Sequence, residues 1–467
     1  MPTKSNYRTI ALSVILTVQL MLQMDFLIVI VSLKDIQADL GFTAANLSWI
    51  PNAFGLAFGG LLLLGGKLGD MIGQVKSFKL GVAIFVIGSL AGGIAPSPEI
   101  LIAARVIQGI GSALAGPSVL ALITILATNE EEKNRGLSLF VAISSIGASV
   151  GLILGGALTE FFSWRWSLLV NVPIGILTVA AIGFLVPETT KVKGKIDLLG
   201  ALTGVLASTA IVYIFISAAE NGWTTPQTIS VFIGAIVMSA IFIWVESKVA
   251  EPLLKLSILR PKPRQGGLMV MAAVLGMHCA TLFLVLQYMQ QVLGYSPLLA
   301  GFAYLPLPAT LFIVSSLVPG LVVKFGNRPL IVLGCILVTA SLIGFSRLTS
   351  HSLYLTDLLI HLLIHSIGIA LVLTPASIVV LDGIDNQDAG IASGVLQVSQ
   401  QIGGAIGIAA IVSIYTANVT PHDFSSGLGA AFLTAAAIAL AAAIAAIFYI
   451  PKKSKIETAT VAVNKPV

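Results

Sequence analysis

Long apolar runs recur along the whole chain, and they constrain its fold more than any other feature. Of the 467 residues, 57% are hydrophobic and only 10% are charged, and the mean hydropathy is +1.01. A helix that crosses the hydrocarbon core of a bilayer needs ~20 mostly apolar residues, whereas soluble domains carry about 25% charged residues. The sequence therefore predicts an all-α integral membrane protein.

Fourteen of these runs are long enough to cross a membrane. They lie at residues 8–33, 46–66, 77–95, 99–127, 136–159, 165–187, 197–218, 227–246, 266–292, 297–322, 329–347, 355–380, 389–417 and 427–450. Repeated small residues, such as Gly403 and Gly407, let helices approach closely where lipid gives no hydrophobic drive for association. We therefore expect a packed bundle of 14 transmembrane helices.

Basic residues are divided unequally between the two sets of loops. Of the 25 lysines and arginines, only Lys34, Arg165 and Arg347 lie on the second side, and Arg105 falls within a span. Basic loops stay in the cytoplasm, and an even number of spans leaves both ends on one side. We therefore expect a multi-pass protein with both termini cytoplasmic. The short tails and the lack of a targeting segment favour a bacterial inner (plasma) membrane.

The longest loop separates two related halves. It contains Pro252, Pro261 and Pro263, which argue against a continuous helix. A weak repeat supports the division, because the loop 65–76 is echoed at 319–329, which aligns Gly73 with Gly326 and Asp70 with Val323. Parallel repeats of this kind are a transporter architecture with the substrate site near the midplane.

The halves and the two surplus spans give the expected organisation of the chain. It comprises an N-terminal six-helix bundle (1–190), two additional transmembrane helices (191–248), a cytoplasmic loop (249–265), a C-terminal six-helix bundle (266–450) and a cytoplasmic tail (451–467).

Several classes of function are disfavoured. A net charge of +5 without a basic patch argues against nucleic acid as a partner. The glycine-rich stretch 60–67 lacks the spacing of a phosphate-binding loop, so we expect no ATP and no cofactor. Spacing reveals neither a catalytic triad nor a metal-ligand set, so an enzyme is not expected. A transporter would then use an ion gradient.

Asp25 and Arg105 are the candidates for proton coupling, since coupling needs a titratable group within the bilayer. Asp25 lies within the run 8–33, in QMDFLIVIV, and Arg105 shares one helical face of the run 99–127 with Gln108. The guanidinium stays charged and would attract the ionised carboxylate. The alternatives are an Asp25 that reaches an interface or a fixed salt bridge, and an Arg105 that snorkels to the membrane surface.

Asp70 is a candidate gating residue in a glycine-rich loop. Gly66, Gly69 and Gly73 surround it and permit a tight turn. Its carboxylate could cap a neighbouring helix or pair with Arg135 to latch an inner gate. A solvated loop without such a role is an equal alternative.

Polar residues near the outer ends of later spans are candidates for a substrate cavity. In the run 355–380, His361 and His365 follow Asp357 at helical spacing, which permits a proton relay or two metal ligands. A third clear ligand for a metal is missing. The other candidates for the cavity are His278, Gln287, Gln291 and Tyr304, together with Gln108 of the run 99–127. The alternative is that the histidines are satisfied by neighbouring helices and the glutamines belong to the outer interface.

Together these segments resemble the fourteen-span drug:proton antiporters of the major facilitator superfamily. MDFLIVIVSL (24–33) is similar to the helix 1 motif, GKLGDMIGQ (66–74) to the loop 2–3 signature and RVIQGIGSA (105–113) to the helix 4 motif. The helix 5 antiporter motif keeps Gly151, Gly155 and Gly156 but has Leu152 where proline is usual. Three further stretches, 163–175, 288–306 and 389–407, resemble the fourteen-span branch.

The resemblance implies alternating access between two six-helix bundles, driven by the proton gradient, with a coupling role for Arg105. The tenth and thirteenth runs, 297–322 and 389–417, lack the extra acidic residues of relatives that handle divalent cations. We therefore expect small lipophilic substrates that are monovalent cations, zwitterions or neutral, exported by a monomer among membrane lipids. A dedicated exporter of one endogenous metabolite, siderophore, amino acid or lipid is the alternative.

Overall fold

The computed structural model consists of helices, with no strand among the residues that it describes. These residues are 4–43, 46–186, 188, 197–249, 256–384, 389–420 and 423–452. Within them, 13 helical stretches are long and apolar enough to cross a bilayer. The expected run 136–159 lies inside a 32-residue helix, α6 (Glu130–Phe161), whose side chains are described in part. The predicted all-α, multi-span fold is confirmed.

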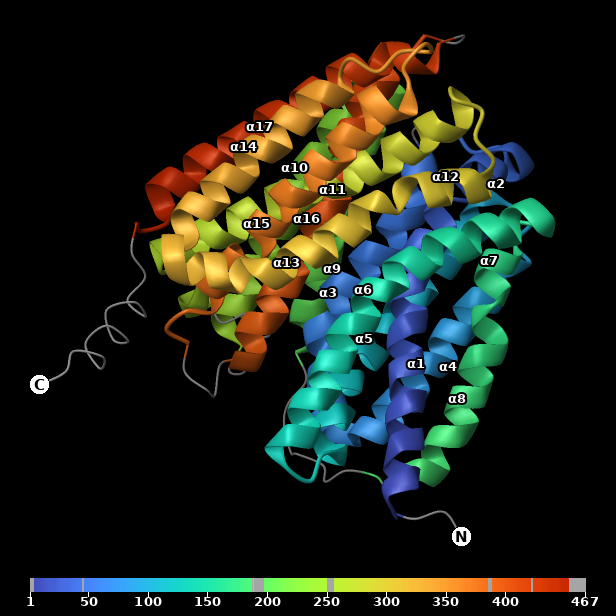
Figure 1. Cartoon of the computed structure of the whole chain (residues 1–467), viewed down its shortest axis with the longest axis vertical. Helices are drawn as coiled ribbons and strands as arrows, with labels where there is room; N and C mark the ends of the chain where they lie inside the picture. The colour runs from blue at the N-terminus through green and yellow to red at the C-terminus, as the bar shows by residue number, and fades with distance from the viewer. Residues whose placement is uncertain are drawn as a thin grey trace, which may run out of the picture. The chain divides into compact units, whose positions relative to one another are not determined.

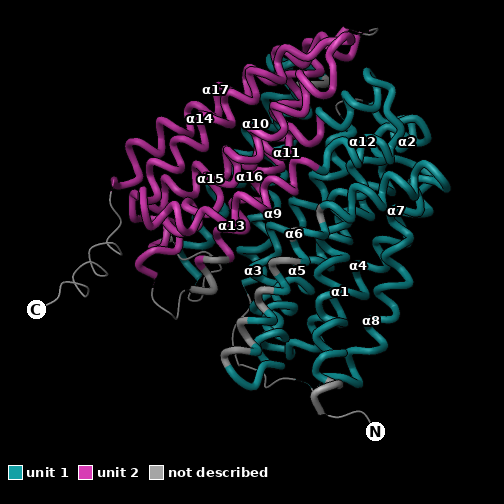
Figure 2. Tube along the Cα trace, in the orientation of Figure 1, with its two compact units in different colours: residues 1–253, 285–305 teal, residues 254–284, 306–467 magenta. Residues whose placement is uncertain are grey.

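The chain divides into two compact units (Figure 2). Unit 1 comprises residues 1–253 and 285–305, and unit 2 comprises residues 254–284 and 306–467. The long helix α11 (Lys262–Gln291) contributes to both units.

Unit 1 contains most of the helices labelled in Figure 1. Besides α6 they are α1 (Lys4–Ile30), α2 (Leu33–Leu40), α3 (Trp49–Ile72), α4 (Gln74–Gly93), α5 (Pro98–Leu126), α7 (Trp166–Leu169), α8 (Asn171–Leu185), α9 (Leu198–Asn221), α10 (Pro226–Lys248) and α12 (Pro297–Tyr304).

Unit 2 contains the first part of α11 and the helices that follow α12. They are α13 (Pro306–Phe325), α14 (Asn327–Phe345), the π-helical turn Tyr354–Leu359, α15 (Ile360–Leu381), α16 (Ala389–Asn418) and α17 (Leu428–Tyr449). Three short 3₁₀ turns, Asn46–Ser48, Leu256–Leu259 and Phe424–Gly427, complete the described elements.

Glycine pairs bring helices into close contact in both units. A methyl group on Gly111 of α5 would lie 2.6 Å from the carbonyl oxygen of Gly81 on α4. In unit 2, a methyl group on Gly334 of α14 would lie 2.7 Å from the carbonyl oxygen of Gly368 on α15. Small residues therefore let the backbones touch, as expected where dispersion rather than water drives helix association.

The repeated glycine-rich segments are sharp junctions between helices rather than long loops. Gly73 has φ +102° and separates α3 from α4, and Gly326 has φ +80° and separates α13 from α14. Positive φ is accessible to glycine without a steric penalty. The expected loop 65–76 is therefore mostly helical, and its echo at 319–329 adopts a similar turn.

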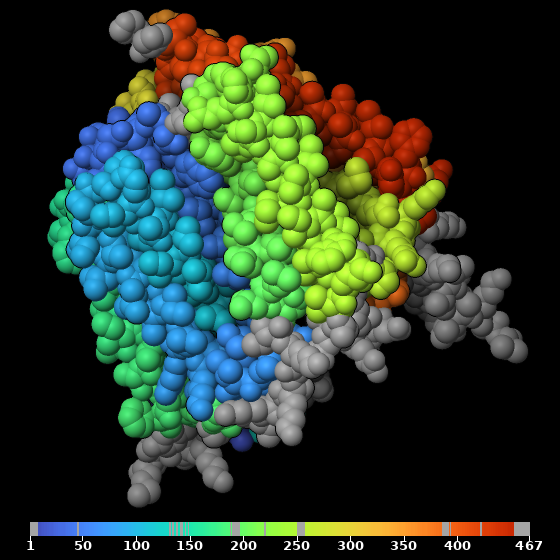
Figure 3. Space-filling view, turned by 180° about the vertical axis from the view of Figure 1, so that it is seen from behind, coloured from blue at the N-terminus to red at the C-terminus, as the bar shows by residue number. Residues whose placement is uncertain are grey.

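The outer helices expose apolar side chains. On α10, Phe232 is 52% exposed, Ile236 56% and Trp244 61%, and the face drawn in Figure 3 shows this helix beside α9. An apolar surface of this kind fits a hydrocarbon environment rather than water.

Candidate functional site

Asp25 and Arg105 form an ion pair inside unit 1. Asp25 lies near the end of α1 and Arg105 in the first part of α5, and both side chains are 0% exposed. Nη1 of Arg105 donates to Oδ2 of Asp25. The two residues that the sequence singled out are therefore partners, and the Arg105 side chain is enclosed by protein.

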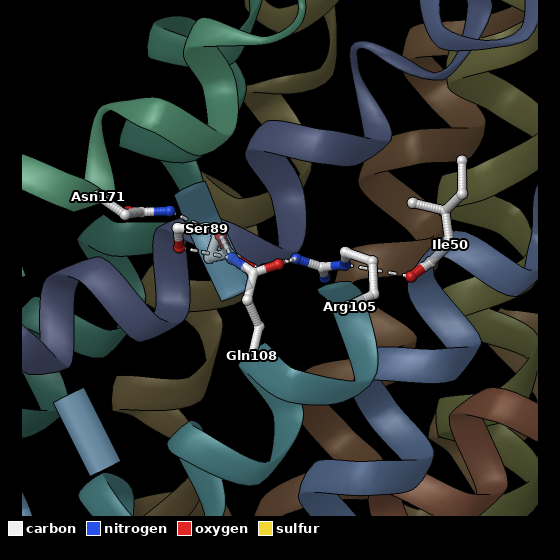
Figure 4. Close-up of polar contacts among 6 residues, drawn as sticks. Ile50, Ser89, Arg105, Gln108 and Asn171 are labelled. Atoms are coloured by element: carbon white, nitrogen blue, oxygen red, sulfur yellow. Dashed lines mark hydrogen bonds and ion pairs between the residues drawn. The ribbon is translucent and has the colours of Figure 1, made fainter. Parts of the chain in front are cut away.

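Amide side chains from two other positions complete the surroundings of the carboxylate (Figure 4). Oδ1 of Asp25 accepts from Nε2 of Gln108 at 3.0 Å and from Nδ2 of Asn171 at 2.8 Å. Nε2 of Gln108 also donates to Oγ of Ser89 at 2.8 Å. Helices α1, α5 and α8 thus meet at the Asp25 carboxylate, and α4 joins them through the bond between Ser89 and Gln108.

Arg105 is held from its other side by α3. Its Nε donates to the carbonyl oxygen of Ile50 at 3.2 Å, and its guanidinium carbon lies 4.5 Å from the centre of the Phe54 ring. A cation over an aromatic face gains electrostatic attraction. Arg105 is therefore fixed independently of Asp25, so its charge remains in place when the carboxylate changes state.

Three buried polar residues, on α5, α8 and α3, keep hydrogen-bonding capacity. Nη2 of Arg105, Oδ1 of Asn171 and both amide atoms of Asn52 have no hydrogen-bond partner among the described residues. Buried polar atoms are normally paired. The site can therefore accept further hydrogen bonds without breaking those around Asp25.

Sequence reasoning missed Asn171 and Ser89 as members of this site. Asn171 is the first residue of α8 and follows the short α7. Asn171 is a polar residue at the start of an apolar run, and this position could have marked it as a site residue. A single sequence does not show, however, which helix faces Asp25.

Asp70 contacts its own helix junction. Its Oδ1 accepts from Nε2 of Gln74 at 2.8 Å, and no ion pair with Arg135 is present among the described residues, where both side chains are exposed. The backbone N–H of Val75, in the first turn of α4, instead donates to Oε1 of Glu188 at 3.1 Å. In this structure neither the latch nor the helix cap is made by Asp70.

The nearby glycines have separate packing roles. A methyl group on Gly69 would approach the Gln74 side chain at 2.8 Å, whereas one on Gly66 would only touch Pro117 at 3.7 Å. Of the three, Gly73 alone has a positive φ.

The glycines of α6 bring it against two neighbours. A methyl group would lie 2.6 Å from the Met24 carbonyl oxygen if placed on Gly151, and 2.6 Å from that of Ile28 if placed on Gly155. On Gly156 it would lie 2.6 Å from the Cα atom of Leu298, beside α12. Gly151 and Gly155 thus set the distance between α6 and the helix that carries Asp25, whereas Gly156 faces α12.

The histidines lie in unit 2, on α11 and α15. Nδ1 of His278 is 3.3 Å from Nε2 of His365, and Nδ1 of His365 is 3.0 Å from Oγ of Ser341. His361 takes no part in these hydrogen bonds. Its Nδ1 lies 2.7 Å from the carbonyl oxygen of Asp357, and its ring packs against Phe345.

The remaining cavity candidates belong to unit 1. Gln287 is 3% exposed and its Oε1 accepts from Nε2 of Gln291 at 2.7 Å, while Tyr304 is 1% exposed on α12. Gln291 also lines a pocket of about 350 Å³ with Lys34, Gln37 and Ala38. The candidates thus fall into a glutamine group in one unit and a histidine group in the other.

Curated relatives are drug resistance and export proteins. The chain is 35% identical over 412 residues to the puromycin resistance protein pur8 of Streptomyces alboniger, covering 87% of this chain and 81% of the relative. It is 34% identical to the cephamycin export protein CmcT of Amycolatopsis lactamdurans, covering 95% and 92% of the two chains. It is 33% identical to the multidrug resistance protein Stp of Mycobacterium tuberculosis, covering 86% and 75%.

Solved transporters share the fold at low sequence identity. The peptide transporter POT, in complex with sulfate, superposes with a TM-score of 0.69 at 15% identity and covers 96% of this chain and 98% of its own. A bacterial homologue of the lysosomal transporter Spinster gives 0.68 at 15% identity, covering 96% and 99%. The sequence model of the Major Facilitator Superfamily matches residues 14–408. The chain therefore belongs to the major facilitator superfamily, as a multi-pass membrane transporter related to drug and antibiotic efflux proteins.

Proposed function

We propose that the chain is a proton-coupled antiporter that exports lipophilic drugs, dyes or biocides by alternating access. The observation that carries this proposal is the fully buried Asp25–Arg105 pair, whose carboxylate also binds Gln108 and Asn171. Ionisable groups within membrane spans are costly and generally serve transport. The cephamycin export protein CmcT and the tetracenomycin C resistance and export protein, both relatives of this chain, support the direction of transport.

Protonation of Asp25 would alter the contacts between α1 and the helices around it. A proton taken up by the carboxylate removes the charge that attracts Arg105, and it adds an O–H donor where donors already converge. Arg105 stays held by Ile50 and Phe54. The attraction between α1 and α5 therefore weakens in the protonated state. Protonation would in this way shift the equilibrium between conformations of the protein.

The proposed setting is a cell inner membrane with both termini cytoplasmic, which follows from the bias of lysine and arginine among the loops. Under that orientation α1 runs outward and Asp25, near its end, lies toward the outer side, where the proton enters. The proton gradient is the energy source, no cofactor takes part, and the transporter acts as a monomer surrounded by lipid.

Monovalent cations, zwitterions and neutral compounds are the proposed substrates. The spans Pro297–Phe325 and Gly394–Asn418 contain no Asp or Glu. A divalent cation would therefore find no carboxylate on these two helices to offset its second charge.

A dedicated exporter of one endogenous compound is the second candidate. Relatives include the cephamycin export protein and a tetracenomycin C resistance and export protein of Streptomyces glaucescens, each named for a single compound. Efflux measured across a panel of unrelated lipophilic compounds separates the two candidates, because the dedicated exporter would move only one chemical type.

Ethidium efflux from everted vesicles under an imposed pH gradient tests the coupling. Asp25→Asn keeps the shape of the side chain but cannot cycle a proton, so we expect gradient-driven efflux to fall by at least tenfold. Asp39→Asn is the matched control, because Asp39 pairs with Arg165 at 2.9 Å near the surface of the same unit. Full gradient-driven efflux by Asp25→Asn would show that another group carries the proton.

A further inference from the structure

A chain of hydrogen bonds through unit 2 joins two histidines and a serine. It runs from His278 on α11 to His365 on α15 and then to Ser341 on α14, at 3.3 and 3.0 Å. The imidazole rings lie within 16° of parallel with centroids 5.5 Å apart, which fits a bond in the plane of the rings. His365 is 0% exposed, whereas His278 is partly exposed.

The serine at the end of the chain sets its direction. The hydroxyl of Ser341 donates its one proton to the carbonyl oxygen of Val338 at 2.7 Å, so its oxygen must accept from Nδ1–H of His365. A neutral imidazole has one donor and one acceptor nitrogen, so Nε2 of His365 accepts from Nδ1–H of His278. Among the nitrogens of this hydrogen-bonded row, Nε2 of His278 is therefore the one whose lone pair receives no hydrogen bond from within the row.

The helices around this pair leave it in its neutral form. On α11 the charged residues are Lys262 and Arg264 in the first turn, and on α14 the charged residue is Arg328 near its start, each about 20 Å along the helix from the pair. The sequences of α15, α16 and α17 contain no Asp, Glu, Lys or Arg. Asp357, in the π-helical turn that leads into α15, lies about 12 Å along the helix before His365. The charged residue of α13, which packs against α15, is Lys324 in its last turn. The titratable neighbours are Cys279, beside His278 on α11, and His361, one turn from His365 on α15.

We propose that Nε2 of His278 is a hydrogen-bond acceptor that binds the N–H or O–H group of a lipophilic substrate. A neutral acceptor in apolar surroundings gains most from a donor that brings its own apolar body, and an ammonium or iminium N–H forms the stronger, charge-assisted bond. This inference rests on the proposed export of lipophilic compounds and names the substrate group that unit 2 recognises.

Nitrogen NMR of the full-length protein, labelled with ¹⁵N-histidine and held in nanodiscs, reads the site without a substrate. We expect protonated Nδ1 and unprotonated Nε2 on both His278 and His365 at neutral pH, with single-histidine variants giving the assignments. Ser341→Ala removes the acceptor at the end of the chain and should release this preference. A proton on Nε2 of His278 in the wild type would overturn the proposal.

Two dyes of matched charge and shape test recognition. Rhodamine 6G carries secondary N–H groups, whereas the ethyl ester of rhodamine B is a similar cation without them. We expect His278→Phe to weaken rhodamine 6G binding about tenfold, as loss of one bond to a charged donor predicts, and to leave the other dye within about twofold. Ser341→Ala should weaken rhodamine 6G alone and by less.

Thr281→Val is the control for the binding measurements, because the Thr281 hydroxyl is buried and donates to its own helix at Met277. Equal loss of both dyes in His278→Phe, or no loss in either variant, would overturn the proposal, as would binding of neither dye by the wild type. Protonation of His278 at Nε2 between pH 5 and 8 with unchanged dye selectivity would identify a proton site instead. Gradient-driven efflux of the rhodamine B ester tests the proposed export separately, because that dye cannot use this bond.

Discussion

Units 1 and 2 bury polar side chains in opposite ways. Unit 1 encloses a charge pair, Asp25 and Arg105, and satisfies its carboxylate with two amide donors. Unit 2 encloses two histidines and a serine in a neutral chain whose direction is fixed by a backbone carbonyl. The same packing of glycine-paired helices therefore supports an ionised site in one unit and a neutral acceptor in the other.

The difference shows which kind of signal each site can respond to. Taking one charge from a buried pair leaves the other uncompensated at a cost of several kcal/mol, so the unit 1 site responds strongly to a proton. A neutral hydrogen bond changes stability by only ~1 kcal/mol, so the unit 2 site suits selection among substrates. Coupling and recognition would then be divided between the units.

Removal of Arg105 should give the largest loss of stability. Arg105→Gln leaves the carboxyl group of Asp25 without its cation in a fully buried position, so we expect the free energy of unfolding to fall by about 3–5 kcal/mol. Thermal unfolding of purified protein in detergent or nanodiscs measures the change.

Arg165→Gln is the matched control for that loss. Arg165 and Asp39 also form an ion pair in unit 1, but their side chains are 31% and 49% exposed, so its loss should cost at most about 1 kcal/mol. Equal effects of the two substitutions would mean that burial does not distinguish the pairs.

The glycine contacts should be equally sensitive in the two units. Gly111→Ala and Gly334→Ala each place a methyl group within 2.8 Å of a neighbouring helix, and we expect each to lower the free energy of unfolding by about 1–3 kcal/mol. Gly234→Ala on α10 is the control, because no atom lies within 4 Å of its added methyl group. If only one of the two substitutions lowered the free energy of unfolding, the glycine contacts of the two units would not be equivalent.

Asp35 should have the smallest effect on stability, and unlike Asp25 it is only half-buried. This residue of α2 is half-buried, and its Oδ2 has no hydrogen-bond partner among the described residues. Burial raises its pKa above the ordinary value of 3.8, against a smaller opposing attraction from Lys34. Because the folded state holds this proton more tightly than the unfolded state does, ionisation of Asp35 destabilises the fold at neutral pH.

Asp35→Asn should therefore stabilise the protein at pH 7, by less than about 1 kcal/mol because solvent screens a half-buried group. The advantage over the wild type should shrink as the pH falls through the raised pKa and vanish below 3.8. Melting temperatures of both proteins between pH 3 and 7 measure it. An advantage that persists at the lowest pH would show that the carboxyl's charge is not the cause.

The sequence located the spans and the first two site residues well. Apolar length alone gives the helices from 98–126 and 226–248 to within a residue or two of the predicted runs, because the bilayer fixes how long a spanning helix must be. Asp25 and Arg105 stood out since charged residues are rare inside such runs. The turn at Gly73 and its echo at Gly326 were also readable, because a positive φ favours glycine.

Other features depended on contacts between distant segments. The sequence did not indicate that Asn171 would meet Asp25, that residues 285–305 would pack with unit 1, or that His278 would meet His365 rather than act alone. Spacing along one helix placed His361 with His365, yet their ring nitrogens have different hydrogen-bond partners.

The sequence by itself determined the class of molecule, the position of nearly every membrane helix and the rarity of its buried charges. The tertiary structure decided which polar groups meet, and so which are ionised partners and which are neutral donors and acceptors. The physical reason is that a bilayer imposes length and hydrophobicity on each helix separately, whereas hydrogen bonds and ion pairs depend on the rotation and neighbours of several helices at once.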